Sequence, residues 1–336
     1  MGKVLPAIAF ALIAAFSGAQ VRAERAASID YDFVERPATL PQSFAAPAGV
    51  TLRFLAIKTI DGERVDAALW QPTSKAVAAT TLIVVVPGSG GSFAGEPVGL
   101  VSPALAAKGY GVLGINTRQR GERRNTDNFL DVRRDIEAAV YTARELGYRA
   151  LVLYGHSLGN IQVQYYAANN WDADLKGVVL SAMFANLPWR SRYMQVADED
   201  RFRMLTEAAF KALREGKERE LLPLRMRRTR TEEEPLTGQH FLSYRAQASS
   251  TADGTYWIKR IPRPILMVRD DGDAISAPFE PYELLSAATS AGSLVPNIKY
   301  IGLPDPKGTN PRGHHFLDNI EPLAETIRAW LAEQRL

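Results

Sequence analysis

The sequence Tyr154-Gly155-His156-Ser157-Leu158-Gly159 decides the fold class of this 336-residue chain. It follows the apolar run Ala150–Tyr154 and precedes a helical pattern that begins at Asn160. A serine at a sharp strand-to-helix turn projects its hydroxyl above the edge of a sheet. The turn leaves no room for side chains two positions away on either side, which explains the glycines. The following helix directs its positive end towards the serine, which favours developing negative charge there.

Short apolar segments alternate with amphipathic helical patterns on both sides of this turn. The predicted strands are 51–59, 65–71, 81–86, 111–116, 150–154, 177–181, 265–268 and 298–303, and the predicted helices include 97–108, 130–146, 278–288 and 320–332. Continuously apolar strands separated by such helices are typical of a parallel sheet covered on both faces. We therefore expect an α/β fold with a mostly parallel, eight-stranded sheet.

The turn at Ser157 resembles the Gly-x-Ser-x-Gly nucleophile elbow of the α/β-hydrolase superfamily and matches it at every fixed position. The resemblance implies an α/β-hydrolase fold with Ser157 as the nucleophile. A serine there argues against the superfamily branches that use an aspartate, such as dehalogenases and epoxide hydrolases. We expect residues 50–184 and 261–336 to form the core, preceded by an amino-terminal extension over 24–49.

The strand and helix pattern stops near Phe184 and resumes at Pro264. Residues 185–260 are therefore interpreted as an insertion that forms a lid over the active site, interrupted by a mobile loop with the charge blocks Arg225–Arg230 and Glu232–Glu234. Its arginines could attract an anionic substrate or form a solvated surface. Several apolar residues could line an acyl pocket or belong to the core: Phe184, Leu187, Trp189, Tyr193 and Met194.

A serine hydroxyl needs an adjacent base to remove its proton, and the chain has four histidines. His156 lies inside the elbow and His240 in the insertion, which leaves His314 and His315. This pair follows the last predicted strand, where the resemblance places the base. We prefer His315, because Phe316 and Leu317 supply the apolar residues that usually follow it; His314 is the alternative.

The stretch Arg269 to Ile275 resembles the family's acid-bearing loop after the seventh strand, and the resemblance implies that the acid that orients the histidine lies there. Asp273 aligns best, because it precedes a short apolar pair, and Asp271 is the alternative. The order nucleophile, acid and histidine along the chain agrees with the family.

A glycine-rich stretch, Val86 to Phe93, follows the third predicted strand. The resemblance assigns the two oxyanion-hole amides to Leu158 and Ser89. Pro87 stands where many members have histidine, so Gly90 could replace Ser89 as donor. The stretch lacks the Lys-Ser/Thr pair of a P-loop and the dinucleotide spacing, and no metal-ligand cluster is evident, so we expect no cofactor and no metal.

The first residues are typical of a secretory signal: Lys3, the apolar run 7–16, then small residues up to Ala23. The run is too short for a transmembrane helix, which needs ~20 residues, so we expect a signal peptide over 1–23 and no stable membrane anchor after its cleavage. Cleavage after Ala19 is the alternative to cleavage after Ala23. The expected location is the periplasm or the extracellular space. The alternative is a buried amino-terminal helix.

The chain lacks cysteine, which excludes disulfides, thiolate metal sites and a cysteine nucleophile. Its net charge of +3 includes Lys3 and Arg22 of the signal, so it does not favour a nucleic-acid partner. We expect an exported serine hydrolase that cleaves a carboxylic ester of a small-molecule or acyl substrate through an acyl-enzyme intermediate. A peptidase, amidase or thioesterase is an alternative, as is a non-catalytic binding protein on this scaffold.

Overall fold

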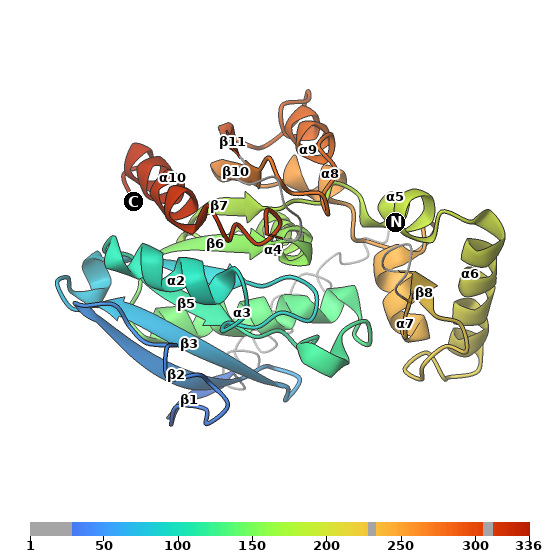
Figure 1. Cartoon of the computed structure of the whole chain (residues 1–336), viewed down its shortest axis with the longest axis horizontal. Helices are drawn as coiled ribbons and strands as arrows, with labels where there is room; N and C mark the ends of the chain where they lie inside the picture. The colour runs from blue at the N-terminus through green and yellow to red at the C-terminus, as the bar shows by residue number, and fades with distance from the viewer. Residues whose placement is uncertain (1–28, 228–232, 305–311) are drawn as a thin grey trace, which may run out of the picture.

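A computed structural model of the chain describes residues 29–227, 233–304 and 312–336 (Figure 1). The predicted signal peptide 1–23 lies outside the described residues, and so do Arg228, Arg230 and Glu232 of the two charge blocks. Within the described ranges, no helix is both long and apolar enough to cross a membrane.

The core is a nine-stranded sheet with the order β1-β2-β3-β5-β4-β6-β7-β10-β11. Its strands are β1 (Asp30–Val34), β2 (Val50–Lys58), β3 (Arg64–Pro72), β4 (Thr81–Val86), β5 (Gly111–Ile115), β6 (Ala150–His156), β7 (Leu175–Ser181), β10 (Ile265–Asp270) and β11 (Ile298–Leu303). In this order, each neighbouring pair from β5 through β4, β6, β7 and β10 to β11 is parallel. The pairs β1–β2, β2–β3 and β3–β5, at one side of the sheet, are antiparallel. The α/β-hydrolase fold with a mostly parallel sheet is therefore confirmed.

The ninth strand, β1, is the one that the sequence pattern missed. It lies in the expected extension 24–49 and pairs with β2 at the sheet edge, with Asp30 opposite Lys58. Its residues are exposed or half-buried, because an edge strand has a partner on one side only. A short segment with two aspartates carries no apolar run, so backbone pairing with β2 accounts for its place in the sheet.

Helices cover both faces of the sheet. One face packs against α2 (Val98–Ala107) and α10 (Ile320–Glu333), and the other against α3 (Val132–Glu145), α4 (Leu158–Asn169) and α9 (Glu280–Ala288). β4 and β5 are buried along their whole length, which agrees with their continuously apolar sequences. Short 3₁₀ turns lie at η1 (Val77–Ala79), η2 (Gly121–Arg123) and η3 (Phe129–Asp131).

The segment between β7 and β10 holds a small subdomain beside the carboxyl ends of β6 and β7 (Figure 1). Its elements are α5 (Leu187–Arg190), the π-helical η4 (Ser191–Val196), α6 (Glu199–Arg214), β8 (Met226–Arg227), β9 (Glu233–Glu234), α7 (Gly238–His240), the π-helical η5 (Phe241–Arg245) and α8 (Gly254–Ile258). Phe202, Leu205 and Phe241 belong to an apolar cluster of its own. Ile258 and Ile261, at its end, join the main core.

Trp330 of α10 offers a test of how the final helix is held. Its side chain is 1% exposed, and a Cβ at Gly177 of β7 would lie 2.7 Å from its ring. We expect Trp330→Ala to lower the free energy of unfolding by ~3–5 kcal/mol, because it leaves a large cavity. Urea unfolding measures this. Trp171→Ala, at a 71% exposed tryptophan, is the matched control and should change stability by less than ~0.5 kcal/mol. Equal losses in both variants would contradict this packing.

Candidate active site

Ser157 stands at the sharp turn between β6 and α4. Its backbone adopts φ 54° and ψ −123°, an unusual conformation for a residue with a side chain, and its N–H donates to Ser181 O at 3.0 Å. A Cβ at Gly155 would lie 2.5 Å from Gly159 O, and a Cβ at Gly159 would overlap Val86 O. The turn therefore requires both glycines, as the sequence predicted.

A chain of hydrogen bonds runs from Ser157 into the sheet edge. Ser157 Oγ lies 3.0 Å from His314 Nε2, and His314 Nδ1 lies 3.0 Å from each carboxylate oxygen of Asp273. The three residues come from the β6–α4 turn, the segment before α10 and the loop after β10. Ser157 is 9% exposed and His314 4% exposed, so the serine hydroxyl, the imidazole and the carboxylate meet in a nearly closed site.

The carboxylate of Asp273 is held ionised by its surroundings. Burial alone would raise the pKa of Asp273, but hydrogen bonds from His314 and Ser276 outweigh it and bring the pKa to about 2. Ile275 N and Ser276 N donate to Asp273 Oδ1 at 2.8 and 3.0 Å, and the Ser276 hydroxyl donates to Oδ2. Asp273 therefore has the charge and the orientation to fix the imidazole tautomer with its proton on Nδ1.

The preference for His315 is corrected, because the structure places His314 beside Ser157. The reason is a backbone contact: a Cβ at Gly313 would overlap the backbone of Gly272 and lie 2.7 Å from Asp273 N, so the chain at residue 313 runs directly against the acid loop. The next residue, His314, is the one that reaches Asp273. His315 is half-buried with its ring 5.3 Å from that of His314, and Phe316 turns into the core.

Of the two aspartates considered for the acid, Asp273 and not Asp271 contacts the histidine. The Asp271 side chain is 58% exposed and lies 3.7 Å from Arg269 Nη1. The Asp273 side chain is fully buried.

The glycine-rich loop after β4 passes directly over Ser157. A Cβ at Gly88 would lie 2.9 Å from Ser157 Cβ and 3.2 Å from Ser157 Oγ, so only glycine fits this approach. Leu158 is the first residue of α4, so its N–H has no partner within the helix. Ser89 is half-buried, whereas Gly90 forms an isolated parallel bridge with Arg120. The backbone of Gly90 is thus engaged with the loop after β5.

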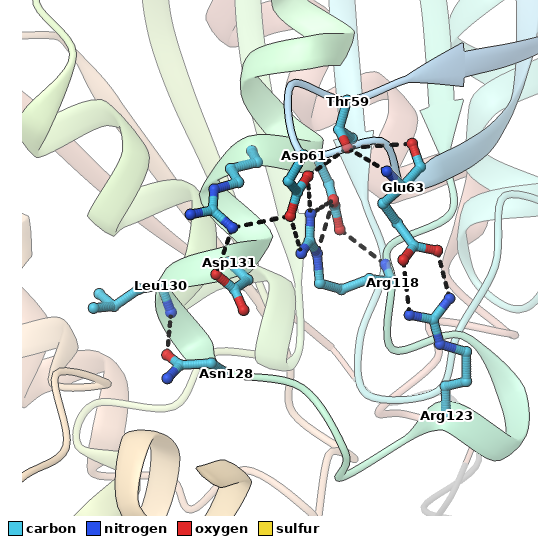
Figure 2. Close-up of polar contacts among 10 residues, drawn as sticks. Thr59, Asp61, Glu63, Arg118, Arg123, Asn128, Leu130 and Asp131 are labelled. Carbon is cyan, nitrogen blue, oxygen red and sulfur yellow. Dashed lines mark hydrogen bonds and ion pairs between the residues drawn. The ribbon is translucent and has the colours of Figure 1, made fainter. Parts of the chain in front are cut away.

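That loop is anchored by a cluster of ion pairs, in which Figure 2 shows the guanidinium of Arg118 facing the carboxylate of Asp61. Arg118 is 7% exposed and lies 2.9 Å from Asp61 and 2.8 Å from the fully buried Asp135. Arg123 pairs with Glu63 in the same view. The cluster borders a cavity of about 870 Å³ between the core and the insertion. Because Arg118 is held on two sides, Arg120 is positioned to pair with Gly90 in the glycine-rich loop after β4.

The other two histidines are buried and bonded elsewhere. His156 Nδ1 lies 3.1 Å from Ser181 Oγ, and burial holds the pKa of His156 well below its usual value. His240 Nδ1 lies 3.2 Å from Asp127 Oδ1, and burial lowers the pKa of His240 as well. Tyr244 OH donates to the same carboxylate at 2.7 Å. The Asp127 carboxylate thus joins the insertion to the loop after β5.

Phe184 supports the imidazole in a way that spacing alone did not reveal. Its ring stacks on His314 with a centroid distance of 6.1 Å and an interplanar angle of 24°. It belongs to an apolar cluster with Leu158 and Leu187 that joins the elbow to the insertion. Trp189, Tyr193 and Met194, also considered for an acyl pocket, are 39%, 48% and 41% exposed. Three further charged residues near the acid loop, which the motif reasoning missed, are Arg190, Arg269 and Glu280.

The chain belongs to the α/β hydrolase fold family, whose model matches residues 81–305. No curated protein sequence matches it significantly. Among solved structures it is similar to Est1E from Butyrivibrio proteoclasticus with bound ferulic acid, at 18% identity and a TM-score of 0.59 over 82% of this chain and 96% of that one. It is also similar to a thermostable carboxyl esterase from Bacillus coagulans, at 15% identity and a TM-score of 0.59 over 85% of this chain and 99% of that one. The α/β hydrolase GrgF from Penicillium sp. sh18 is similar as well, at 14% identity and a TM-score of 0.63 over 84% of this chain and 99% of that one.

The two adjacent histidines can be separated by single substitutions. We expect His314→Ala to lower kcat for a hydrolysed ester at least ~10³-fold, because Ser157 then lacks a base. His315→Ala should change kcat less than about tenfold, which is ~1.4 kcal/mol of barrier. Steady-state assays on both purified variants, with circular dichroism to confirm folding, measure the difference. A larger loss in His315→Ala than in His314→Ala would refute the assignment.

Proposed function

We propose that this protein is an exported serine hydrolase that cleaves carboxylic esters through an acyl-serine intermediate. The observation that carries the proposal is the hydrogen-bonded chain Ser157–His314–Asp273, buried at the elbow of an α/β hydrolase. Its order and distances are those a nucleophile, a base and an orienting acid require. Est1E with ferulic acid and the carboxyl esterase, both similar in fold, support ester chemistry.

In the first half of the reaction, Ser157 Oγ attacks the ester carbonyl carbon while His314 Nε2 takes its proton. The carbonyl oxygen gains negative charge and accepts hydrogen bonds from the N–H groups of Leu158 and Ser89, each worth ~3 kcal/mol in such sites. The intermediate collapses when the ester C–O bond breaks and His314 gives the proton to the departing alcohol oxygen. Asp273 stays ionised and stabilises the imidazolium.

In the second half, water attacks the acyl-serine carbonyl while His314 accepts a proton from it. Collapse breaks the bond to Ser157 Oγ, to which His314 returns the proton, and the carboxylic acid leaves. The nearly closed site and the stacked Phe184 limit the water around the imidazole. We propose that the inserted segment acts as the lid of this site and contributes to substrate selection.

Replacement of the nucleophile tests the reaction. Wild-type protein should hydrolyse p-nitrophenyl esters and take up one fluorophosphonate label. Ser157→Ala should lose at least ~10³-fold in kcat and all labelling. Ser286→Ala, at an exposed serine of α9, is the matched control and should retain both. Folded wild type that neither turns over nor labels would exclude the proposed reaction, and selective cleavage of peptides would assign a peptidase.

Export is tested by the amino terminus of protein recovered from the producing cells. We propose cleavage after Ala23, so that the intact mass corresponds to a chain beginning at Glu24. Substitution of the apolar run with charged residues should keep the protein inside the cell and uncleaved. A mature chain that retains Met1 would contradict export by a cleaved signal.

A further inference from the structure

Arg190, at the end of α5, is a buried cation of the inserted segment beside the active site. It is 6% exposed, and its Nη1 lies 2.8 Å from Glu280 Oε2. Its Nη2 donates to Ile275 O, two residues after Asp273. Its guanidinium carbon lies 4.5 Å from the centre of the Phe184 ring, which stacks on His314. Arg190 therefore contacts both of the elements that orient the imidazole.

Glu280, the first residue of α9, completes the connection. It is 1% exposed and accepts hydrogen bonds from Ala277 N at 2.7 Å and from Ala185 N at 3.4 Å. The ion pair with Arg190 thus joins three segments: the start of the insertion, the chain that carries Phe184, and the acid loop. A displacement of α5 would therefore displace both the segment that carries Phe184 and the acid loop.

The opposite side of the acid loop is held by Arg269 of β10. Its Nη2 donates to Asp273 O at 2.6 Å and to Ser276 O at 3.4 Å. The loop from Asp273 to Ala277 therefore lies between two buried arginines, one from the sheet and one from the insertion. Arg269 belongs to a strand of the main sheet, whereas Arg190 belongs to the inserted segment.

The energetics favour a role beyond stability. A buried ion pair is a weak source of stability, because desolvation offsets the attraction of the charges. Burial raises the pKa of Glu280 and lowers the pKa of Arg190, so desolvation disfavours both charged forms and the attraction between them offsets that cost. The pair makes directional contacts to Ile275 O and Ala277 N in the loop that holds Asp273, and to Ala185 N beside Phe184, which is what a position-holding role requires.

We propose that Arg190 and Glu280 are positioning residues, a buried ion pair through which the inserted segment holds the acid loop and Phe184 so that Asp273 and His314 face Ser157. This inference rests on the proposed serine-hydrolase function. Through this ion pair, the arrangement of Ser157, His314 and Asp273 depends on the position of the insertion as well as on the core.

The charges around the pair give the proposal an electrostatic signature. Asp273, His156 and His315 face the imidazole of His314. Arg190 is faced by Glu280, by Asp273 and by Arg245 of η5, which bonds to Ser191. In the wild type Glu280 balances Arg190. Glu280→Gln keeps the shape but leaves a net positive charge near the imidazole, which disfavours the imidazolium.

The test compares three variants. They are the single variant Glu280→Gln, the double variant that combines Arg190→Met with Glu280→Gln, and Glu207→Gln, a matched control at an exposed ion pair of α6. We expect Glu280→Gln to lower kcat ~10–100-fold with little change in KM, since a misplaced catalytic group costs on this order. The acid limb of its kcat/KM profile should shift to lower pH by about half a unit. The double variant should return the acid limb to the wild-type position while kcat stays low. Glu207→Gln should match the wild type in kcat and in the pH of the acid limb.

Titration of the His314 imidazole by NMR, in the wild type and in Glu280→Gln, gives the same comparison without a substrate. A shift towards lower pH in the folded Glu280→Gln variant, together with a kcat that stays low in the charge-balanced double variant, supports the positioning role. An unchanged titration and an unchanged acid limb, with activity lost only in proportion to thermal stability, would overturn it and leave a purely structural pair. Absence of turnover and labelling in the wild type would overturn the proposed function instead, while the titration still decides the role of the pair.

Discussion

The turn at Ser157 is the constraint on which the rest of the active site depends. Ser157 has a positive φ, which persists only where the surrounding structure holds it. Here β6, α4 and the end of β4 pack so closely around the turn that only glycine fits at positions 155 and 159. The same close packing brings the loop after β4 over the serine at Gly88. Ser157 and the glycine-rich loop after β4, the proposed nucleophile and oxyanion loop, are therefore positioned by the same close packing, and the other groups of the site come from other segments.

The remaining groups arrive on loops that the core holds in different ways. The acid loop is held by Arg269 from the sheet, and the histidine segment by the contact of Gly313 with Gly272. The loop after β5 is anchored by Arg118 between two carboxylates. Buried arginines thus hold two of these three loops, because several directed hydrogen bonds specify a loop conformation that apolar contacts alone would leave free.

The insertion differs from these loops, because it has an apolar cluster of its own and meets the core through mixed contacts. One is the apolar cluster around Leu158 and Phe184, and another is the Asp127 carboxylate shared by His240 and Tyr244. The third is the Arg190–Glu280 ion pair. If these contacts set the acid loop as we propose, then the insertion, which we also propose to contribute to substrate selection, completes the geometry of the base, and substrate binding would be linked to reactivity.

The sequence by itself determined the elbow, the parallel strands and the region of each site residue, because these follow from local rules: glycine at a crowded turn, and continuous apolar runs in strands buried on both faces. It did not reveal β1, whose place comes from pairing with β2. Nor could it choose His314 over His315, or show that Arg190 meets Glu280. Those outcomes depend on how segments far apart in the chain approach each other. A shift of one residue at Gly313 would present a different side chain to Asp273, and only the packed backbone decides that register.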